Sequence, residues 1–414
     1  MKVLVLGAGV VGVTTAYRLL KDGHEVTVIE RNATAAEETS ANNAGLVAPG
    51  HSYAWSSPRA PGILLKSLWR DDQALRFKLK PDPRLWHWSW LFLRQCNSAC
   101  ARTNTLRKHR LCMYAQQALH ETVAETGIDY DARRGGLLYL YRSQETFDLG
   151  VANMGILADD GQELRAIDRD EAARVDPALA PVKDKFAGAI YCPSDESGDA
   201  RKFTLGLAEA CAALGARFHY RTAITGIESE GDRVTAVITD KGRETAEAYV
   251  LALGCESPIL ARRLGVRLPI YPVKGYSVTL PVAGRNNPPN IGGVDEDNLT
   301  AYTRLGDRLR VTATAEFAGY DLSHKPRDFR HMLGVARDVF PEGADYEQPD
   351  YQACLRPMTP EGTPRFGLGP QRNLYYNTGH GHMGWTMACG AARITADLIA
   401  GRTPDIPLDG MTLQ

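Results

Sequence analysis

The clearest hydrophobic pattern of the chain lies in residues 1–30. The apolar run KVLVL at 2–6 is typical of a strand that is buried on both faces. Apolar positions at helical spacing follow through Ala16, Leu19 and Leu20, and EVTVI at 25–29 indicates a second buried strand. A DG turn at 22–23 precedes that strand, so the segment predicts one complete β-α-β unit.

The rest of the chain alternates between helical and strand-rich stretches. Residues 84–125 follow a helical pattern, and GGLLYLYRS at 135–143 indicates a strand. A helix leading to a strand is predicted within 196–220, and short strands with EGD and DKG turns follow, up to a buried strand that ends at Gly254. Residues 266–351 are predicted as mostly strands, followed by a helix.

Three glycines after the first strand carry the first chemical signal. Gly7, Gly9 and Gly12 have the spacing G-x-G-x-x-G. Gly7 permits a tight turn, Gly9 lets the backbone approach a pyrophosphate, and Gly12 allows the helix to pack closely on the strand. The pyrophosphate would lie at the helix N-terminus, and Glu30 can accept hydrogen bonds from a ribose diol. The motif predicts a dinucleotide site and leaves NAD and FAD open.

Charge and composition exclude several classes of function. The 48 basic and 49 acidic residues are interspersed and leave a net charge of −1, so no nucleic-acid partner is expected. The eight cysteines are scattered, as in a reduced cytosolic protein, and predict no metal site. No apolar run approaches the roughly 20 residues of a membrane span. We expect a cytoplasmic protein, either soluble or peripheral at the inner face of the membrane.

The tryptophan-rich segment WHWSWLFL at 86–93 leaves two interpretations open. It is either a membrane or quinone contact, since tryptophan favours interfaces, or a buried helix of the second domain.

Five segments together resemble a known family. They are the opening glycine fingerprint, ETSANNAG at 38–45, YPVKGYS at 271–277, LRPMTPEGTP at 355–364 and NTGHGHMGWTMACG at 377–390. They are similar to the bacterial D-amino acid dehydrogenases, within the superfamily of D-amino-acid oxidase, glycine oxidase and sarcosine oxidase. The match follows the whole chain in order.

The resemblance implies an α/β fold with FAD as the cofactor. A glutathione-reductase-type FAD-binding domain would be interleaved with a smaller mixed-sheet α+β substrate domain. We expect residues 1–85, 195–262 and 352–414 in the FAD-binding domain, and residues 86–194 and 263–351 in the substrate domain.

The implied reaction is oxidation of a D-amino acid, D-proline and hydroxyproline types included, by hydride transfer to flavin N5. The imino acid hydrolyses to a 2-oxo acid and ammonia, and the electrons pass to a quinone-type acceptor. Two alternatives stay open: an oxidase that uses O₂ on glycine or sarcosine, and a flavin-binding subunit of a larger complex.

The resemblance also implies which residues surround FAD. The first turn would hold the diphosphate, residues 38–45 would cover the ring and ribityl chain, and the C-terminal motif would stabilise negative charge on the flavin through backbone amides and a helix N-terminus. The expected contacts are Gly7, Gly9, Val10, Val11, Gly12, Glu30, Arg31, Thr39, Ser40, Asn43, Ala44, Gly45, Leu46, Ile224, Gly254, Gly379, His380, Gly381, Met383, Gly384, Trp385 and Thr386.

Substrate binding is expected to centre on Arg356. This residue matches the family's carboxylate-binding arginine, and a planar guanidinium holds a carboxylate through two parallel hydrogen bonds. Lys274 and Tyr276 are expected to line the active site, and His51 and Tyr53 to belong to a lid.

Two positions depart from the family's pattern. Cys354 replaces a glycine, and it is interpreted either as a small buried thiol or as a site of covalent flavin attachment. His382 and Met383 replace a small residue and leucine, which leaves the substrate open.

Overall fold

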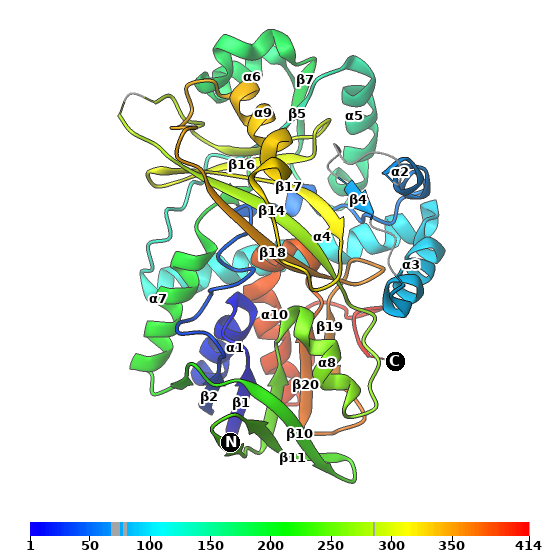
Figure 1. Cartoon of the computed structure of the whole chain (residues 1–414), viewed down its shortest axis with the longest axis vertical. Coiled ribbons are helices and arrows are strands. Elements are labelled where there is room, and N and C mark those ends of the chain that lie inside the picture. Colours follow the sequence, from blue (N-terminus) through cyan, green and yellow to red (C-terminus); the bar gives the residue numbers. More distant parts are fainter. Residues whose placement is uncertain (68–74, 78–80, 285, 414) are drawn as a thin grey trace.

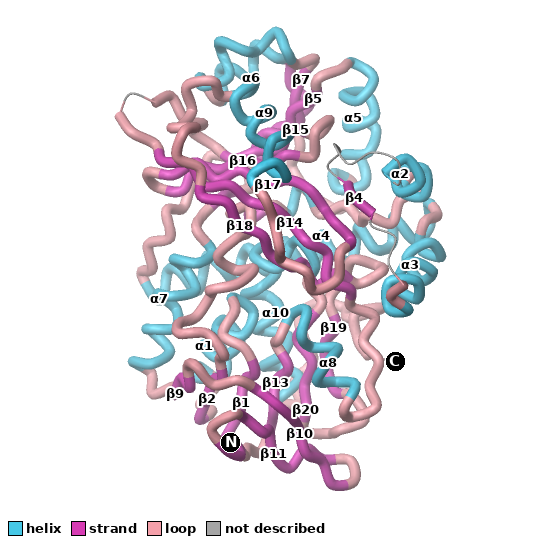
Figure 2. Tube along the Cα trace, in the orientation of Figure 1, coloured by secondary structure: helices cyan, strands magenta, loops and turns pink. Residues whose placement is uncertain are grey.

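Two sheets, one above the other in Figure 1, organise the chain. The computed structural model describes residues 1–67, 75–77, 81–284 and 286–413. A mostly parallel sheet lies near both the N-terminus and the last helix, and a larger mixed sheet lies across the other half of the molecule (Figures 1 and 2). The α/β fold class predicted from the sequence is confirmed.

The parallel sheet is built from segments far apart in the chain. In the described residues its order is β19-β20-β13-β1-β2-β9, and β19 alone runs antiparallel to its neighbour. Its strands are β1 (Lys2–Leu6), β2 (Glu25–Ile29), β9 (Arg217–His219), β13 (Ala248–Leu251), β19 (Arg365–Leu368) and β20 (Leu374–Thr378).

Apolar side chains on both faces of this sheet are buried, as the uninterrupted hydrophobic run of β1 predicts. One face, with Val3 and Val5, packs on helices α1 (Val10–Lys21), α7 (Ala200–Ala213) and α10 (Gly384–Ile399). The other face, with Leu4 and Leu6, packs on a small antiparallel sheet and a short helix. These are β10 (Ile224–Glu230), β11 (Arg233–Thr239), β12 (Gly242–Glu244) and α8 (Ser257–Arg262).

The mixed sheet has the order β18-β14-β17-β16-β15-β5-β7-β6 within the described ranges, and β4 pairs with β17. Its strands are β4 (Leu75–Phe77), β5 (Leu137–Tyr141), β6 (Arg165–Asp168), β7 (Gly188–Cys192), β14 (Tyr271–Pro281), β15 (Gly292–Asp295), β16 (Thr300–Leu305), β17 (Arg308–Phe317) and β18 (Asp350–Met358). A further pair joins β3 (Leu46–Val47) to β8 (Glu196–Ser197).

Helices cover the outer face of the mixed sheet. Helices α6 (Arg169–Val175) and α9 (Arg330–Val339) pack on it in a core that includes Tyr276, Val278 and Val311. Helix α5 (Gln144–Ala158) lies beside β7, while α2 (Ala60–Ser67) and α3 (Pro83–Gln95) lie at the edge near β4 (Figure 1). The long α4 (Ser98–Thr126) packs against α10. None of the helices among the described residues is long and apolar enough to cross a membrane.

The strand pairing moves two of the expected domain boundaries. β18 continues to Met358 inside the mixed sheet, past the boundary expected at 351, because it pairs with β14 along Asp350–Met358. β4 pairs with β17 in the same sheet, although residues 75–77 were assigned to the FAD-binding domain. These two boundaries depend on pairing between strands that are far apart in the chain. A local hydrophobic pattern does not indicate such pairing.

Candidate active site

A cavity of about 980 Å³ has walls from both sheets. Its lining extends from the glycine turn after β1 to strands β17 and β18 of the mixed sheet. This volume is at the upper end of the range for small-molecule and cofactor pockets. Segments from the start, the middle and the end of the chain contribute to it, as the recurring nucleotide-binding signals predict.

The first glycine turn forms one end of the cavity. Gly7 has a φ of +101°, and a Cβ there would lie 2.8 Å from the carbonyl oxygen of Ala252. A Cβ on Gly12 would lie 1.9 Å from the carbonyl oxygen of Gly7, so only glycine allows α1 to pack this closely. Gly12 therefore acts in helix packing and does not line the cavity.

The N-terminus of α1 faces the cavity. Gly7, Gly9, Val10 and Val11 line it, and the first turn of the helix holds no acidic residue. The amide of Val10 donates to the Ser40 hydroxyl at 2.9 Å. Because unpaired amides and the helix dipole favour negative charge, this end is suited to a phosphate group.

Glu30, at the end of β2, lies on the same wall. Its Oε2 accepts from the amide of Ala8 at 2.8 Å, and its Oε1 accepts from the amide of Asn32 at 2.9 Å. Oε1 also accepts from Nδ2 of Asn32 at 2.9 Å. A carboxylate has about four acceptor sites, so one remains for a ribose hydroxyl. The neighbouring Arg31 is paired with Glu38 at 2.6 Å, so its charge is already partly neutralised and does not indicate a site for a 2′-phosphate.

The segment 38–45 is held against the mixed sheet by specific hydrogen bonds. The Thr39 hydroxyl donates to the carbonyl of Leu355 at 2.8 Å. Buried Arg310 of β17 donates through Nη1 to the carbonyls of Ala41 and Asn43, at 2.9 and 3.0 Å. These bonds fix a polar, irregular segment as one wall of the cavity.

A second helix N-terminus lines the cavity where the C-terminal motif folds. The short turn Gly381–Met383 leads into α10, and Gly381, Met383, Gly384, Trp385 and Thr386 all line the cavity. Gly379 does not line it; with a φ of +79° it makes the turn after β20. The positive end of the α10 dipole is thus directed to the same space as that of α1.

Several buried polar atoms of the lining lack a partner among the described residues. They are Nε2 of His380, Nε1 of Trp385 and Oδ1 of Asn377. Buried polar groups are nearly always hydrogen-bonded in folded proteins, so such atoms at one cavity fit a polar ligand. Burial also lowers the pKa of His380 to about 3, so this imidazole is neutral and can donate or accept.

Arg356 lies at the mixed-sheet end of the cavity. Its side chain extends from β18, and Nη1 donates to the carbonyl of Thr314 at 2.9 Å. No carboxylate in the described part of the chain forms a salt bridge with it, and burial lowers the pKa of the guanidinium. The group remains charged, because an arginine does not lose its proton in a protein. A half-buried cation that faces a cavity without an anionic partner is a site suited to an anion.

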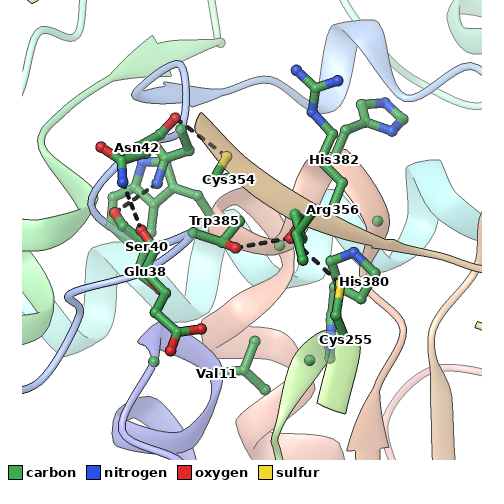
Figure 3. Close-up of a pocket in the computed structure, with 18 of the residues that line it drawn as sticks. Val11, Glu38, Ser40, Asn42, Cys255, Cys354, Arg356, His380, His382 and Trp385 are labelled. Atoms are coloured by element: carbon green, nitrogen blue, oxygen red, sulfur yellow. Dashed lines mark hydrogen bonds between the residues drawn. The ribbon is translucent and has the colours of Figure 1, made fainter. Parts of the chain in front are cut away.

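An aromatic wall stands beside Arg356. His382 stacks on Trp55 with ring centroids 4.7 Å apart. Figure 3 shows His382 and Arg356 at the end of the cavity opposite Val11. Burial, reinforced by the positive charges of Lys108 and Arg356, lowers the pKa of His382 well below its usual value. His382 is therefore a neutral ring and adds no charge to this end.

Of the two lid candidates, one lines the cavity. His51 lies in the lining, where its Nε2 is 2.7 Å from Oε1 of Glu296 and its ring stacks on Tyr139. The Glu296 carboxylate raises the pKa of His51 against the opposing effect of burial. Tyr53 does not line the cavity, because Lys108 of α4 holds its backbone carbonyl at 2.7 Å.

Lys274 and Tyr276, which were expected to line the active site, are not in the lining of this cavity. Both lie on the helix-covered face of β14, away from the cavity. The Tyr276 hydroxyl donates to Glu316 at 2.8 Å, while Lys274 donates to the carbonyl of Ser323 and lies over the Tyr276 ring. Alternate residues of a strand face opposite sides, so the two residues share one face and leave the other to Gly275.

The remaining expected cofactor contacts all line the cavity. They are Thr39, Ser40, Asn43, Ala44, Gly45, Leu46, Ile224 and Gly254.

The pattern of the sequence did not reveal several other lining residues. The most prominent are Trp55, Asn42, Cys255 and the β17 stretch 312–315. The aromatic Trp55, close to His51 in the sequence, could have indicated a lining residue. The sequence around residues 312–315 did not indicate that this part of β17 borders the cavity.

Cys354 lines the cavity as a buried thiol. Its Sγ donates to the carbonyl of Asn42 at 3.7 Å (Figure 3), and burial raises its pKa. Since the thiolate is the reactive form, these surroundings favour the interpretation as an inert small side chain. Across the described residues no group of three His, Cys, Asp or Glu side chains is placed to hold a metal ion.

Comparison with known proteins agrees with this geometry. The family model described as FAD dependent oxidoreductase matches residues 2–398. "D-amino acid dehydrogenase 2" of Mesorhizobium japonicum is 48% identical over 412 residues, which cover 99% of each chain. The "D-amino acid dehydrogenase" of Paramagnetospirillum magneticum is 45% identical over 417 residues, covering 100% of this chain and 98% of its own length.

Solved structures share the fold. The glycine oxidase of Geobacillus kaustophilus superimposes with a TM-score of 0.76 at 24% identity, covering 100% of this chain and 98% of that one. The L-proline dehydrogenase of P. horikoshii gives a TM-score of 0.75 at 19% identity, with 100% and 96% covered. The expected superfamily and its FAD-binding fold are confirmed. The chain belongs to the family of FAD-dependent oxidoreductases.

Proposed function

We propose that the protein oxidises D-amino acids to imino acids, which then hydrolyse to 2-oxo acids and ammonia. The observation that carries this proposal is the guanidinium of Arg356, which faces the cavity without a carboxylate partner in the described ranges. Relatives named D-amino acid dehydrogenase, at 48% and 45% identity over nearly the whole chain, support the substrate class.

The residues of the cavity fit FAD. The α1 N-terminus suits its pyrophosphate, and Glu30 suits its ribose diol. The α10 N-terminus and the unpartnered polar atoms of His380 and Trp385 suit the polar edge of the ring system. When bound, FAD supplies the acceptor for the two electrons that leave the substrate.

Arg356 would hold one end of the substrate, and the aromatic wall beside it, formed by Trp55 and His382, would contact the other end of the same molecule. A guanidinium that keeps one hydrogen bond to Thr314 has other N–H groups available for both oxygens of a carboxylate. The neutral His382 and Trp55 bound the adjoining space without competing for that carboxylate. The lining offers no group to which we assign the role of a base.

We further propose a quinone-type electron acceptor and association with the inner face of the membrane. The alternative is an amine oxidase that uses O₂. An assay for hydrogen peroxide during turnover separates the two, because an oxidase produces it in proportion to the substrate consumed.

The test of the substrate site is replacement of Arg356. Arg356→Leu should lower kcat/KM for D-amino acids by roughly two to four decades, because breaking a buried ion pair costs about 3–5 kcal/mol. Arg356→Lys should recover only part of this, since an ammonium cannot reproduce the planar two-point contact. The measurement is anaerobic flavin reduction against the concentration of the amino acid.

Arg304→Leu is the matched control. Arg304 lies in β16, donates to the carbonyl of Gly306 and does not line the cavity. It should leave flavin reduction unchanged, and all three variants should retain FAD. Equal reduction by wild type and Arg356→Leu would contradict the proposal.

A further inference from the structure

The exposed apolar side chains of the described residues gather at one place. Of the twelve large exposed hydrophobic residues, Ile259, Leu299 and Leu322 line the cavity, and four others lie outside it and outside the group described next. The other five lie on α2 and α3, which stand at the outer edge of the molecule in Figure 1. They are Ile63, Leu65, Trp86, Trp90 and Leu93, each exposed by 48–61%. We call these five side chains the α2–α3 surface.

Helix α3 is apolar on two opposite faces. Leu85, Trp88 and Phe92 are buried against the mixed sheet, with the Trp88 Nε1 donating to the carbonyl of Met358 at 2.8 Å. Trp86, Trp90 and Leu93 follow the same helical spacing on the exposed side. The exposed side of α3 thus carries three large apolar side chains that the described residues leave about half exposed. The buried face agrees with the interpretation of WHWSWLFL as a buried helix, while the membrane or quinone contact stays a prediction for the exposed face.

The charges around this surface are mostly positive. Arg59 and Arg94 are exposed and form no salt bridge with any carboxylate that the structure describes, and Arg94 lies 4.8 Å from the centre of the Trp90 ring. In the described part of 59–95 the single acidic residue is Asp82, which pairs with Arg84. Arg76, the other basic residue there with a described side chain, is mostly buried and pairs with Glu316 and Asp328. These two exposed arginines, together with the exposed tryptophans, complement an anionic lipid surface.

The surface is continuous with the cavity. Ile63 is 48% exposed and also lines the cavity, together with Leu64, Leu75 and Phe92. The inner sides of α2, β4 and α3 thus form an apolar wall that leads from the exposed tryptophans toward the active site. A lipophilic acceptor in a bilayer would meet this wall first.

We propose that the α2–α3 surface docks the protein on an anionic lipid bilayer, with Trp86 and Trp90 at the headgroup level and Arg59 and Arg94 on lipid phosphates. This orientation turns the apolar wall of the cavity toward the membrane. Delivery of electrons to a membrane quinone rests on the proposed function, whereas lipid binding does not.

Co-sedimentation with vesicles tests the docking directly. The FAD-loaded protein should bind vesicles of phosphatidylcholine mixed with phosphatidylglycerol more tightly than vesicles of phosphatidylcholine alone, and less tightly at high salt. Trp86→Ser with Trp90→Ser should weaken binding about tenfold or more, since interfacial binding scales with buried apolar area. Arg59→Ser with Arg94→Ser should weaken it roughly 30-fold on the anionic vesicles, because each basic side chain near such a surface contributes about fivefold.

The control is Leu214→Ser with Leu368→Ser, two exposed hydrophobic residues outside this surface, and it should bind as wild type does. All variants should reduce a water-soluble dye with D-amino acids at the wild-type rate, so a failure of the proposed function would be seen separately. Absence of wild-type binding to either vesicle, or equal binding by the tryptophan variant, would overturn the proposal. If the wild type bound no vesicles and the tryptophan variant changed from dimer to monomer, the surface would be assigned to a second copy of the chain. That result would also overturn the proposal.

Discussion

Glu30 has two roles at the end of β2. Its carboxylate fixes the first turn through the amides of Ala8 and Asn32, and we propose that its remaining acceptor site binds the ribose of FAD. Glu30→Ala should weaken FAD binding by about 1.5–3 kcal/mol, the usual value of a hydrogen bond to a charged group. Calorimetric titration of the apoprotein with FAD measures this change in the free energy of binding.

Glu25→Ala provides the comparison, because Glu25 begins the same strand and pairs only with Arg217 at the surface. It should leave the FAD affinity unchanged. An unaltered affinity in Glu30→Ala would mean that Glu30 serves the turn alone.

Residues whose role follows from local backbone geometry were the ones that the sequence predicted well. Gly7 and Gly12 are needed because a Cβ at either position meets nearby backbone, and the motif expresses that need directly. Lys274 and Tyr276 were misplaced for a different reason. Alternation puts them on one face of a strand, but it does not say which face borders the cavity.

At the scale of elements, β14 and β18 together set the position of Arg356. Gly275 pairs with Cys354, and a Cβ on Gly275 would lie 2.6 Å from Nη2 of Arg356. The glycine thus provides the space in which the guanidinium lies. The motif VKGYS contains this positioning residue at its centre, between the two side chains that were expected to act.

Gly275→Ala should displace the guanidinium and lower kcat/KM by about 10²-fold, the cost of roughly 1 Å of misplacement. The fold should hold, because the clash is with the end of a side chain. The same substitution in an Arg356→Leu background should change little, and this non-additivity is the readout.

Gly226→Ala in β10 is the control for loss of a strand glycine, since its Cβ would make only ordinary or slightly tight contacts. Fully additive effects of Gly275→Ala and Arg356→Leu on kcat/KM would show that Gly275 does not act through the position of Arg356.

At the scale of the molecule, Asp195 joins segments from different parts of the chain. It accepts from the amide of Gly50 at 2.9 Å and from the hydroxyl of Tyr139 in β5. Burial raises its pKa to about 6, although these hydrogen bonds oppose the shift. The folded pKa lies above the unfolded value, so the protein loses stability as the pH rises through this interval.

Asp195→Asn should therefore remove about 2 kcal/mol of the change in unfolding free energy between roughly pH 4.5 and pH 7.5. Urea unfolding at the two pH values measures it. The pKa of His51 is also raised, in part by the Asp195 charge, so Asp195→Asn reduces the pH-dependent contribution of His51 in the same direction, and the difference between the two proteins reports the coupled pair. The control is Asp184→Asn, at an exposed carboxyl, which should reproduce the wild-type dependence of unfolding free energy on pH. The same dependence in Asp195→Asn would mean that the Asp195 carboxyl has an ordinary pKa and would contradict the prediction.

The domain boundaries show why the architecture was harder to predict than the site. FAD contacts cluster in short motifs, whereas β4 and β18 join the mixed sheet through pairing with β17 and β14. Those pairings depend on partners far away in the chain, and the composition of either strand does not encode them.

The order of the parallel sheet has a consequence for synthesis in the cell. β1 leaves the ribosome long before its neighbour β13, which ends at residue 251, and before β20 beyond it, which ends at residue 378. At about 5–20 residues per second, β1 waits roughly 20 to 70 seconds for the sheet to be completed. During that time the nascent chain presents an apolar strand and half of a nucleotide site. We therefore expect FAD to bind only after residue 378 has been synthesised.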